Sequence, residues 1–285
     1  MKEIFPSVYY LGGQTKAKTL FENQFEIPNG MSYNSYLFKD DINILFDTVD
    51  SSISSDFISR LKEALNGDTL DYLVVQHVEP DHSYQIGEVL KAYPCCKIVC
   101  SQLAKKMISA YFEVKEKNYL IVEEGQSLKS AHFNFKFISA PLVHWPEVLF
   151  TYEENNQYLL SADAFGTFGS FSSIFFNEQI DNEAFYSEAR RYYTNIVGKF
   201  GCNVLNVLKK ASALSIKAIL PLHGPIFVNN YQKLIDLYSK WASYTPESFS
   251  EVAIFYGSMY SNTEKACFRL KEILEGKGIK TSAYD

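Results

Sequence analysis

Four short apolar runs follow one another in the middle of the chain, with polar turns and no helical pattern between them. They cover residues 119–122, 133–139, 148–152 and 158–162. Strands joined directly by short turns predict a mixed or antiparallel sheet. On both sides of this segment, apolar runs alternate with amphipathic helical patterns. Helix-rich flanks around an antiparallel centre predict an α/β fold in which two sheets pack together with helices on both outer faces, an αββα sandwich.

Composition and charge limit the classes of function. Lys and Arg number 27 against 33 Asp and Glu, the net charge is −6, and no basic stripe is present. Binding to a nucleic-acid backbone is therefore not expected. No apolar run is long enough to cross a membrane, and the N-terminus lacks the apolar segment of a signal peptide. The five cysteines form no CxxC pair. We expect a cytoplasmic protein with free thiols and with no membrane or nucleic-acid partner.

A second pattern begins behind a polar linker at residues 244–248. Residues 251–256 predict a strand and residues 264–275 predict a helix, after which the chain becomes extended again. One such β-loop-α unit is too short to close a core of its own as a parallel α/β domain. The predicted division is a first domain of residues 1–245, followed by a linker and an incomplete second domain at residues 246–285.

The strongest chemical signal is the hexapeptide HVEPDH at residues 77–82, which follows an apolar strand. It contains four potential metal ligands, His77, Glu79, Asp81 and His82. Packing gives no reason to crowd two imidazoles and two carboxylates in this way, whereas a cation does, because it supplies their shared counter-charge. Loops at strand ends are also where α/β proteins place their sites. We therefore interpret the motif as a metal site rather than as a solvated loop.

Three further potential ligands, His144, Asp163 and His223, also follow predicted strands. Four of the five histidines thus lie in strand-end loops, and His132 is the exception. Taken with the hexapeptide, these residues give seven candidate ligands. Seven are too many for one ion of usual coordination number, but they suit two ions that are bridged by a carboxylate.

The HxExDH order, followed by a distant His, Asp and His, resembles the metallo-β-lactamase fold, whose hydrolases usually carry HxHxDH and bind two zinc ions. Glu79 stands where those hydrolases have a histidine, and a harder, anionic ligand favours iron. This substitution, together with a C-terminal unit similar to the start of a flavodoxin, resembles the flavodiiron proteins, also called A-type flavoproteins. The resemblance runs through essentially the whole chain and is carried by MSYNSYLF (31–38), HVEPDH (77–82), PLVHWPE (141–147), SADAFGTFG (161–169), RYYTNIV (191–197), LPLHGPI (220–226) and GSMYSNTE (257–264). The first of these looks like the family's N-terminal strand.

The resemblance implies a ligand set for each of two iron ions. One iron would take His77, Glu79 and His144. The other would take Asp81 and His223, with His82 either bound or just outside, and Asp163 would bridge the pair. Trp145 and Tyr193 match positions that line the site, although ordinary aromatic core is an equally good interpretation of both.

The C-terminal loop carries the second part of the resemblance. Its hydroxyl and amide side chains, and the backbone N–H groups at the start of a helix, suit an anion. It resembles the flavodoxin loop that holds the phosphate of FMN, which implies this role for Ser258, Met259, Tyr260, Ser261, Asn262 and Thr263. Ser261 stands where such loops often have Gly. The later loops that sandwich the flavin ring have no counterpart in this sequence, so the chain alone is expected to hold FMN poorly or not at all.

The activity that the resemblance implies is that of an oxidoreductase, which reduces O₂ to water or NO to N₂O at the two irons. FMN would feed the irons, a rubredoxin-like carrier or a flavin reductase would feed FMN, and a head-to-tail homodimer or a tetramer would bring one subunit's flavin near the other's irons. The sequence leaves O₂ and NO open. A dizinc hydrolase, in which a bridging hydroxide attacks an ester, amide or phosphodiester, is the alternative from another class. A metal-binding fragment without turnover is the third.

Overall fold

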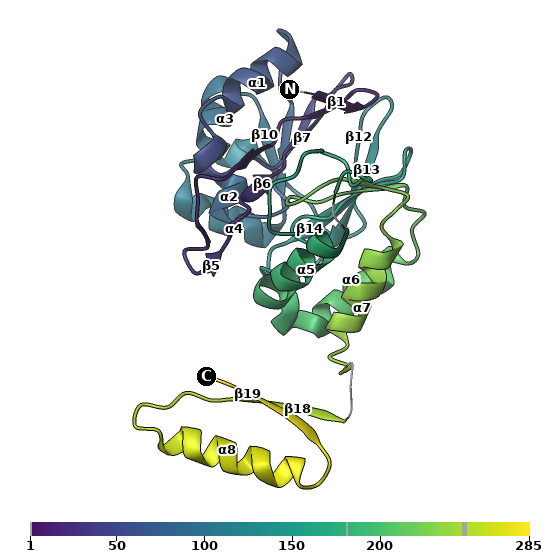
Figure 1. The fold of residues 1–285 in the computed structure, drawn as a ribbon. Helices are drawn as coiled ribbons and strands as arrows, with labels where there is room; N and C mark the ends of the chain where they lie inside the picture. The colour runs from purple at the N-terminus through teal and green to yellow at the C-terminus, as the bar shows by residue number, and fades with distance from the viewer. Residues whose placement is uncertain (1, 181, 247–249) are drawn as a thin grey trace. The chain divides into compact units, whose positions relative to one another are not determined.

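The computed structural model describes residues 2–180, 182–246 and 250–285. The chain separates into two compact units, Met1–Ser243 and Tyr244–Asp285, which are described one at a time. The larger unit contains the two main sheets and most of the helices (Figure 1). The predicted linker at residues 244–248 lies partly outside the described residues.

The first sheet of the larger unit has seven strands. Along the sheet they are β1 (Lys2–Phe5), β2 (Val8–Tyr10), β7 (Tyr36–Phe38), β8 (Ile44–Phe46), β9 (Tyr72–Val74), β10 (Lys97–Cys100) and β11 (Tyr119–Ile121). The pairs from β1 to β8 are antiparallel, and the pairs from β8 to β11 are parallel. The carboxyl end of β9, which leads into the HVEPDH motif, therefore lies at the same edge as those of β8 and β10.

The second sheet has six strands and contains three of the four runs predicted to form the antiparallel centre. The prediction was wrong for residues 119–122, which form β11 of the first sheet and pair in parallel with β10, because the connection from β10 contains a helix. Its order is β12 (Ser127–Lys129), β13 (Asn134–Ser139), β14 (Leu149–Glu153), β15 (Tyr158–Leu160), β16 (Ala218–Leu220) and β17 (Phe227–Val228). All pairs are antiparallel except β15 with β16. Because β13 and β15 are both antiparallel to β14, the carboxyl ends of β13, β15 and β16 lie at one edge of the sheet.

The central strands of each sheet are buried on both faces, whereas the edge strands β1 and β12 are partly exposed. In β8, Ile44 and Phe46 join a core shared with Phe135 and Phe137 of β13, whereas Leu45 joins the core beneath the helices. A strand places successive side chains on opposite faces, so two buried faces require apolar residues at every position. The predicted αββα sandwich thus has one core between the sheets and a second cluster of buried residues that extends under both helical layers.

Helices form the two outer layers (Figure 1). The first sheet is covered by α1 (Phe57–Leu65), α3 (Ile86–Ala92) and α4 (Gln102–Tyr111), and the second by α5 (Asn182–Tyr192), α6 (Gly201–Ala211) and α7 (Gln232–Ala242). The helix α5 is followed by a π-helical turn, Tyr193–Val197, and a 3-10 turn, Gly198–Phe200. The short helix α2 (Pro80–Ser83) and the 3-10 turns Ser51–Ile53 and Glu116–Asn118 complete the connections.

The N-terminal segment departs from the expectation of one strand at residues 31–38. It forms β6 (Met31–Tyr33), which pairs with β3 (Gly13–Thr15), and then β7 in the first sheet. The break falls at Asn34, whose side-chain amide donates to the carbonyl groups of Pro221 and Gly224 and so ties this segment to the loop of His223. A hairpin of β4 (Leu20–Phe21) and β5 (Phe25–Glu26) precedes β6.

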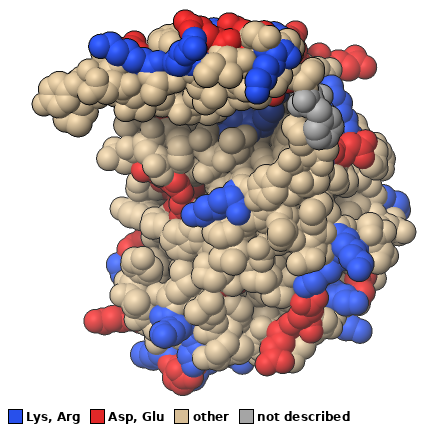
Figure 2. Space-filling view, turned by 90° about the horizontal axis from the view of Figure 1, so that it is seen from below, with Lys and Arg blue, Asp and Glu red and all other residues tan. Residues whose placement is uncertain are grey.

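The smaller unit is a single β-α-β arrangement. It contains β18 (Glu251–Phe255), α8 (Asn262–Glu275) and β19 (Lys280–Tyr284), and the two strands are parallel. Several of its large apolar side chains are exposed, Met259 by 90% and Tyr260 by 83%. Among the described residues of the whole chain, no helix is long and apolar enough to cross a membrane. Side chains of both charges are interspersed with wide uncharged areas on the face seen in Figure 2.

Candidate metal centre

The structure brings all seven predicted ligands together at the ends of strands. His77 and Glu79 lie in the loop after β9, and Asp81 and His82 lie on α2. The other three, His144, Asp163 and His223, follow β13, β15 and β16, whose carboxyl ends share one edge of the second sheet. All seven residues are buried, none exposed by more than 8%.

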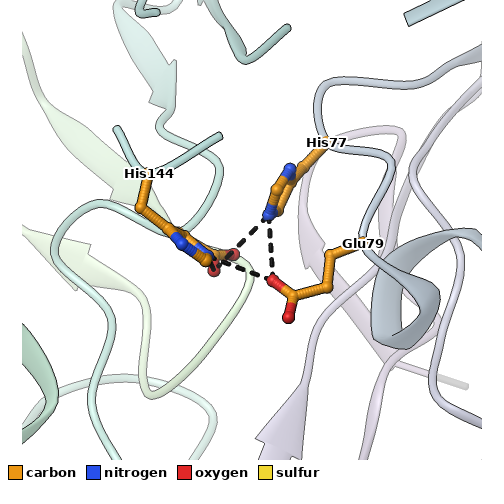
Figure 3. Close-up of side chains that lie close together, drawn as sticks. His77, Glu79 and His144 are labelled. Atoms are coloured by element: carbon orange, nitrogen blue, oxygen red, sulfur yellow. Dashed lines mark hydrogen bonds and ion pairs between the residues drawn. The ribbon is translucent and has the colours of Figure 1, made fainter. Parts of the chain in front are cut away.

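The first group of ligand atoms consists of His77, Glu79, His144 and Asp163, all within 4.8 Å of one another. Glu79 Oε2 lies 3.1 Å from His77 Nε2 and 3.0 Å from His144 Nε2 (Figure 3). Asp163 Oδ2 lies 3.3 Å from His144 Nε2 and 3.9 Å from His77 Nε2. Two imidazole nitrogens and two carboxylate oxygens thus face a common point from three different loops.

The second group consists of Asp81, His82 and His223, and Asp163 reaches it with its other oxygen. Asp81 Oδ2 lies 3.5 Å from His82 Nε2 and 3.4 Å from His223 Nε2, and the two Nε2 atoms are 3.1 Å apart. Asp163 Oδ1 is 3.0 Å from His82 Nε2 and 3.7 Å from His223 Nε2. The carboxylate of Asp163 therefore lies between the groups, with one oxygen toward each.

The hydrogen bonds that these residues lack indicate that they can hold two cations. Both carboxylate oxygens of Asp81, Oδ1 of Asp163 and Nδ1 of His82 are buried without a hydrogen-bond partner among the described residues. Buried polar atoms are nearly always hydrogen-bonded, so such a concentration in one place requires an explanation. A bound cation satisfies carboxylate oxygens directly, and mixed imidazole and carboxylate donors suit first-row divalent metals such as iron or zinc.

Without a cation, the imidazoles and carboxylates of the cluster shift one another's pKa values in opposite directions. Burial lowers the pKa of His77, but the surrounding carboxylates outweigh burial and raise that pKa well above its ordinary value. In the same way the pKa values of His82 and His144 rise to about 9 each. Burial raises the pKa of Glu79 and of Asp163, but the imidazoles beside them hold both pKa values well below the usual range. Protons on the imidazoles thus take the place that a cation can occupy.

Several contacts behind the ligands orient them. Nδ1 of His77 bonds Glu147 Oε1 at 2.9 Å, and Nδ1 of His223 bonds the carbonyl oxygen of Ser32 at 2.8 Å, so each ring turns Nε2 toward the cluster. The Tyr192 hydroxyl donates to Asp163 Oδ2 at 3.0 Å. Glu147 and Tyr192 lie inside two of the motifs quoted for the resemblance, yet sequence reasoning assigned them no role. A carboxylate directly after a Trp-Pro pair was the one available signal for Glu147.

The two predicted aromatic neighbours are placed differently. The Trp145 ring lies edge-on to His77, with 5.3 Å between ring centroids. The Tyr193 ring packs on the rings of Tyr238 and Trp241, and its neighbour Tyr192 is the residue that contacts Asp163. The role of Tyr193 at the site therefore stays a prediction, while the tyrosine that bonds a candidate ligand is Tyr192. On a helix one residue rotates the side chain by about 100°, and the pattern RYYTNIV does not reveal which tyrosine faces inward.

A cavity of about 200 Å³ adjoins the cluster. It is lined by Lys18, Phe21, Glu22, Tyr33, Asp50, Glu79, Pro80 and Asp81. Lys18 forms an ion pair of 2.6 Å with Asp50, and burial together with the carboxylate of Glu79 raises the pKa of Glu22. The β4–β5 hairpin and the residues before it thus supply a small, polar approach to Glu79 and Asp81. No sequence pattern indicated this cavity.

The predicted phosphate loop lies in the smaller unit, between β18 and α8. Ser261 is the residue before the helix, in a left-handed conformation with φ of 59°, and its side chain makes no capping bond. Ser258 Oγ is buried without a hydrogen-bond partner among the described residues, whereas Met259 and Tyr260 are exposed. Asn262 and Thr263 form the first turn of α8. An unpaired hydroxyl beside the start of a 14-residue helix fits an anionic group such as phosphate.

Comparison with known proteins agrees with this geometry. Residues 31–224 match the family described as ODP family beta lactamase. The chain belongs to this family. It is 32% identical over 262 residues to a nitric oxide reductase of Moorella thermoacetica, which covers 91% of this chain and 65% of the relative. It is 30% identical over 243 residues to an anaerobic nitric oxide reductase flavorubredoxin of Salmonella arizonae, covering 84% and 50%. The chain thus spans between half and about two thirds of the length of these curated relatives.

Solved structures give the same result for the fold. The rubredoxin oxygen:oxidoreductase of Desulfovibrio gigas matches with a TM-score of 0.87 and 27% identity, over 99% of this chain and 71% of that one. The flavodiiron protein of Giardia intestinalis matches with a TM-score of 0.85 and 26% identity, over 99% and 68%. The predicted resemblance to flavodiiron proteins and the predicted sandwich are therefore confirmed.

Proposed function

We propose that this chain is the metal-binding part of an oxidoreductase that reduces O₂ or NO at a pair of iron ions. The observation that carries the proposal is the position of Asp163, whose two oxygens face two separate groups of buried ligand atoms. One group would hold an iron with His77, Glu79 and His144, and the other with Asp81, His82 and His223. The names of the relatives, nitric oxide reductase and rubredoxin oxygen:oxidoreductase, support the choice of reaction.

The residues around the site suit a small substrate. When bound, two ferrous ions would supply electrons and open coordination positions for O₂ or NO. The adjoining cavity is about 200 Å³ and is lined by carboxylates, Glu22 and Asp50 among them, with one lysine. A diatomic gas fits such a space, whereas a bulky anionic ester is opposed by its size and charge. Buried Phe and Tyr rings around His223 keep bulk water away from the second group.

The remaining assignments of cofactor and partners follow from the relatives. The loop at residues 257–263 would hold the phosphate of FMN through Ser258 and the first N–H groups of α8. A rubredoxin-like protein or a flavin reductase would supply electrons, and a head-to-tail homodimer or tetramer would bring flavin and iron of different subunits together. The described smaller unit offers one β-α-β arrangement for this purpose, which supports the phosphate contact but supplies no pocket for the flavin ring.

Metal analysis and turnover on the same preparation test the proposal. The full chain would be produced with iron and purified without O₂, and iron and zinc would be counted per chain. With an artificial one-electron donor, O₂ uptake and N₂O formation would then be measured separately. About two irons and catalytic loss of either gas are expected. One zinc and no iron after iron-replete production, or ester hydrolysis without gas reduction, would overturn the proposal in favour of a hydrolase.

A matched pair of variants separates the metal site from general damage. Asp163→Asn should abolish turnover, since it removes the charge that faces both groups. Glu153→Gln changes another fully buried carboxylate, which accepts hydrogen bonds from backbone N–H groups of residues 134, 155 and 156 far along β14 from the site. Turnover that fell equally in both variants would point to folding rather than to the proposed site.

A further inference from the structure

Glu147 is a fully buried carboxylate whose contacts with the cluster, among the described residues, are with His77 and the residue after it. Its Oε1 accepts from Nδ1 of His77 at 2.9 Å and from the backbone N–H of Val78 at 2.9 Å. Its Oε2 has no hydrogen-bond partner in the part of the chain that the structure describes. Its backbone is fixed as well, because its carbonyl accepts from the hydroxyl of Ser101 at the start of α4. Both the ring and the loop that carries it are thus held by one oxygen atom.

This contact determines how His77 can bind a cation. With Nδ1–H donated to Glu147, the free lone pair is on Nε2, which faces Glu79 and Asp163. A carboxylate behind a ligand histidine fixes its tautomer and ring orientation and increases its basicity as a ligand. Because the Val78 N–H bond uses the same oxygen, the ring cannot turn without disturbing the loop between His77 and Glu79.

The other group has no such partner among the described residues. Nδ1 of His223 bonds a neutral carbonyl oxygen, that of Ser32, and Nδ1 of His82 has no hydrogen-bond partner there. The two groups are alike in the types of their candidate ligands, since each has two imidazoles and one carboxylate of its own and shares Asp163. Glu147 therefore places an additional carboxylate behind one group only.

We propose that Glu147 is a positioning residue that makes the two metal positions unequal. It orients His77 and strengthens it as a ligand, so that the ion held by His77, Glu79 and His144 is bound more tightly than the ion held by Asp81, His82 and His223. If the ions are iron, the additional negative charge also favours the ferric state at this position. The difference in affinity is expected for any divalent metal, whereas the preference for the ferric state rests on the proposed function.

Two substitutions separate orientation from charge. Glu147→Gln keeps an oxygen that can accept from both N–H groups but removes the charge, and Glu147→Leu removes the acceptor as well. Glu153→Gln is the control, because Glu153 is also a buried carboxylate that accepts from backbone N–H groups, but its hydrogen-bond partners among the described residues include no imidazole of the cluster. Each variant of the full chain would be titrated with Zn²⁺ against a chromophoric chelator, and with Co²⁺ while the visible spectrum is recorded. Thermal unfolding of the metal-free proteins would show which variants fold.

One of two sites should weaken, by roughly tenfold in Glu147→Gln and by about 100-fold in Glu147→Leu, the range found when such partners are removed. The Co²⁺ spectrum of that site should change, while the other site and the control keep their wild-type values. Equal weakening of both sites, or no change in a folded Glu147→Gln protein, would overturn the proposal. If wild-type protein bound no second ion, the two-metal function itself would fail, which is a different outcome.

Iron gives a second measurement that a purely structural role would not affect. In the iron-loaded protein, Glu147→Gln should raise the midpoint potential of one iron, because loss of negative charge favours the ferrous ion. A tenfold change in the ferric-to-ferrous preference corresponds to about 59 mV for one electron. A shift in the opposite direction, or identical shifts in the Glu153→Gln control, would contradict the electronic part of the proposal.

Discussion

Replacing Asp163 should reduce metal binding more than replacing any other ligand, because only this side chain faces both groups. Its Oδ2 lies within 3.9 Å of two imidazole nitrogens, and its Oδ1 lies within 3.7 Å of two others. The replacement of choice is Asp163→Asn. It removes the charge but keeps an oxygen that can accept from the Tyr192 hydroxyl. His82→Gln is the comparison, since its Nε2 lies in the second group alone.

The expected loss of metal affinity depends on how many ions each substitution affects. Removing a partner that only supports a ligand costs roughly 10–100-fold in metal affinity. Loss of a charged ligand should cost each ion at least as much, which is about 1.4–2.8 kcal/mol per ion. Asp163→Asn affects two ions, so the product of the two affinities should fall by at least about 10²–10⁴-fold. His82→Gln affects one ion and should cost about the square root of that.

The assay is a Zn²⁺ titration against a chelator of known affinity, with metal counted per chain after gel filtration. His132→Gln is the control, because it changes an exposed imidazole that is outside both groups. Thermal unfolding without metal shows whether each variant folds. Equal losses in Asp163→Asn and His82→Gln, or two retained ions in Asp163→Asn, would refute the placement of Asp163 between two ions.

Three further predictions test the fold around the site. Phe135→Ala should lower the free energy of unfolding by about 3–5 kcal/mol in urea titration, because the ring is fully buried between the sheets against Phe38 and Phe46; a loss under about 1 kcal/mol would contradict that packing. The hydrogen bond to Asp40 raises the pKa of His132. The contribution of this bond to the stability of the fold should therefore be present below about pH 6.5 and should disappear as the pH rises through the pKa of His132 in the folded protein. Melting temperatures of wild type and His132→Gln measured against pH check this, and parallel curves would count against it. A chain ended after Ser243 should keep the metal stoichiometry of the full chain, since all seven ligands lie before that residue; loss of one ion in the folded, shortened chain would show that the smaller unit contributes.

The clustering of the seven candidate ligands could be predicted because their signal is local. Each lies within a few residues of the end of an apolar run, and strand ends of one sheet converge whatever the details of packing. His144 is the most informative case, since nothing near it in sequence resembles the HVEPDH motif. His144 could be assigned to the site only because it follows a strand of the antiparallel centre. The structure places its Nε2 3.0 Å from Oε2 of Glu79.

What could not be predicted depends on which way a side chain turns. Tyr192 and Tyr193 are equivalent in composition, and only the helical register decides that the hydroxyl of Tyr192 reaches Asp163. The short strands β1 to β5 were not predicted, because runs of two to four residues carry no measurable periodicity. In this part of the chain only a strand at residues 31–38 was expected. The Lys18 to Glu22 side of the cavity belongs to this segment, so the approach to the site came only from tertiary structure.

Charge balance connects the unusual Glu79 with the proposed chemistry. Four buried carboxylates have an oxygen within 3.5 Å of an imidazole nitrogen of a candidate ligand, those of Glu79, Asp81, Glu147 and Asp163. With these four ionised and the imidazoles neutral, two divalent ions balance the four negative charges, which lowers the cost of burying them. A histidine in place of Glu79, as in the zinc hydrolases that the motif resembles, would leave one positive charge. That surplus would oppose any further increase in metal charge. If the ions are iron, as proposed, the balanced cluster would tolerate the change from ferrous to ferric ion that accompanies electron transfer, so Glu79 would favour the proposed reduction over hydrolysis.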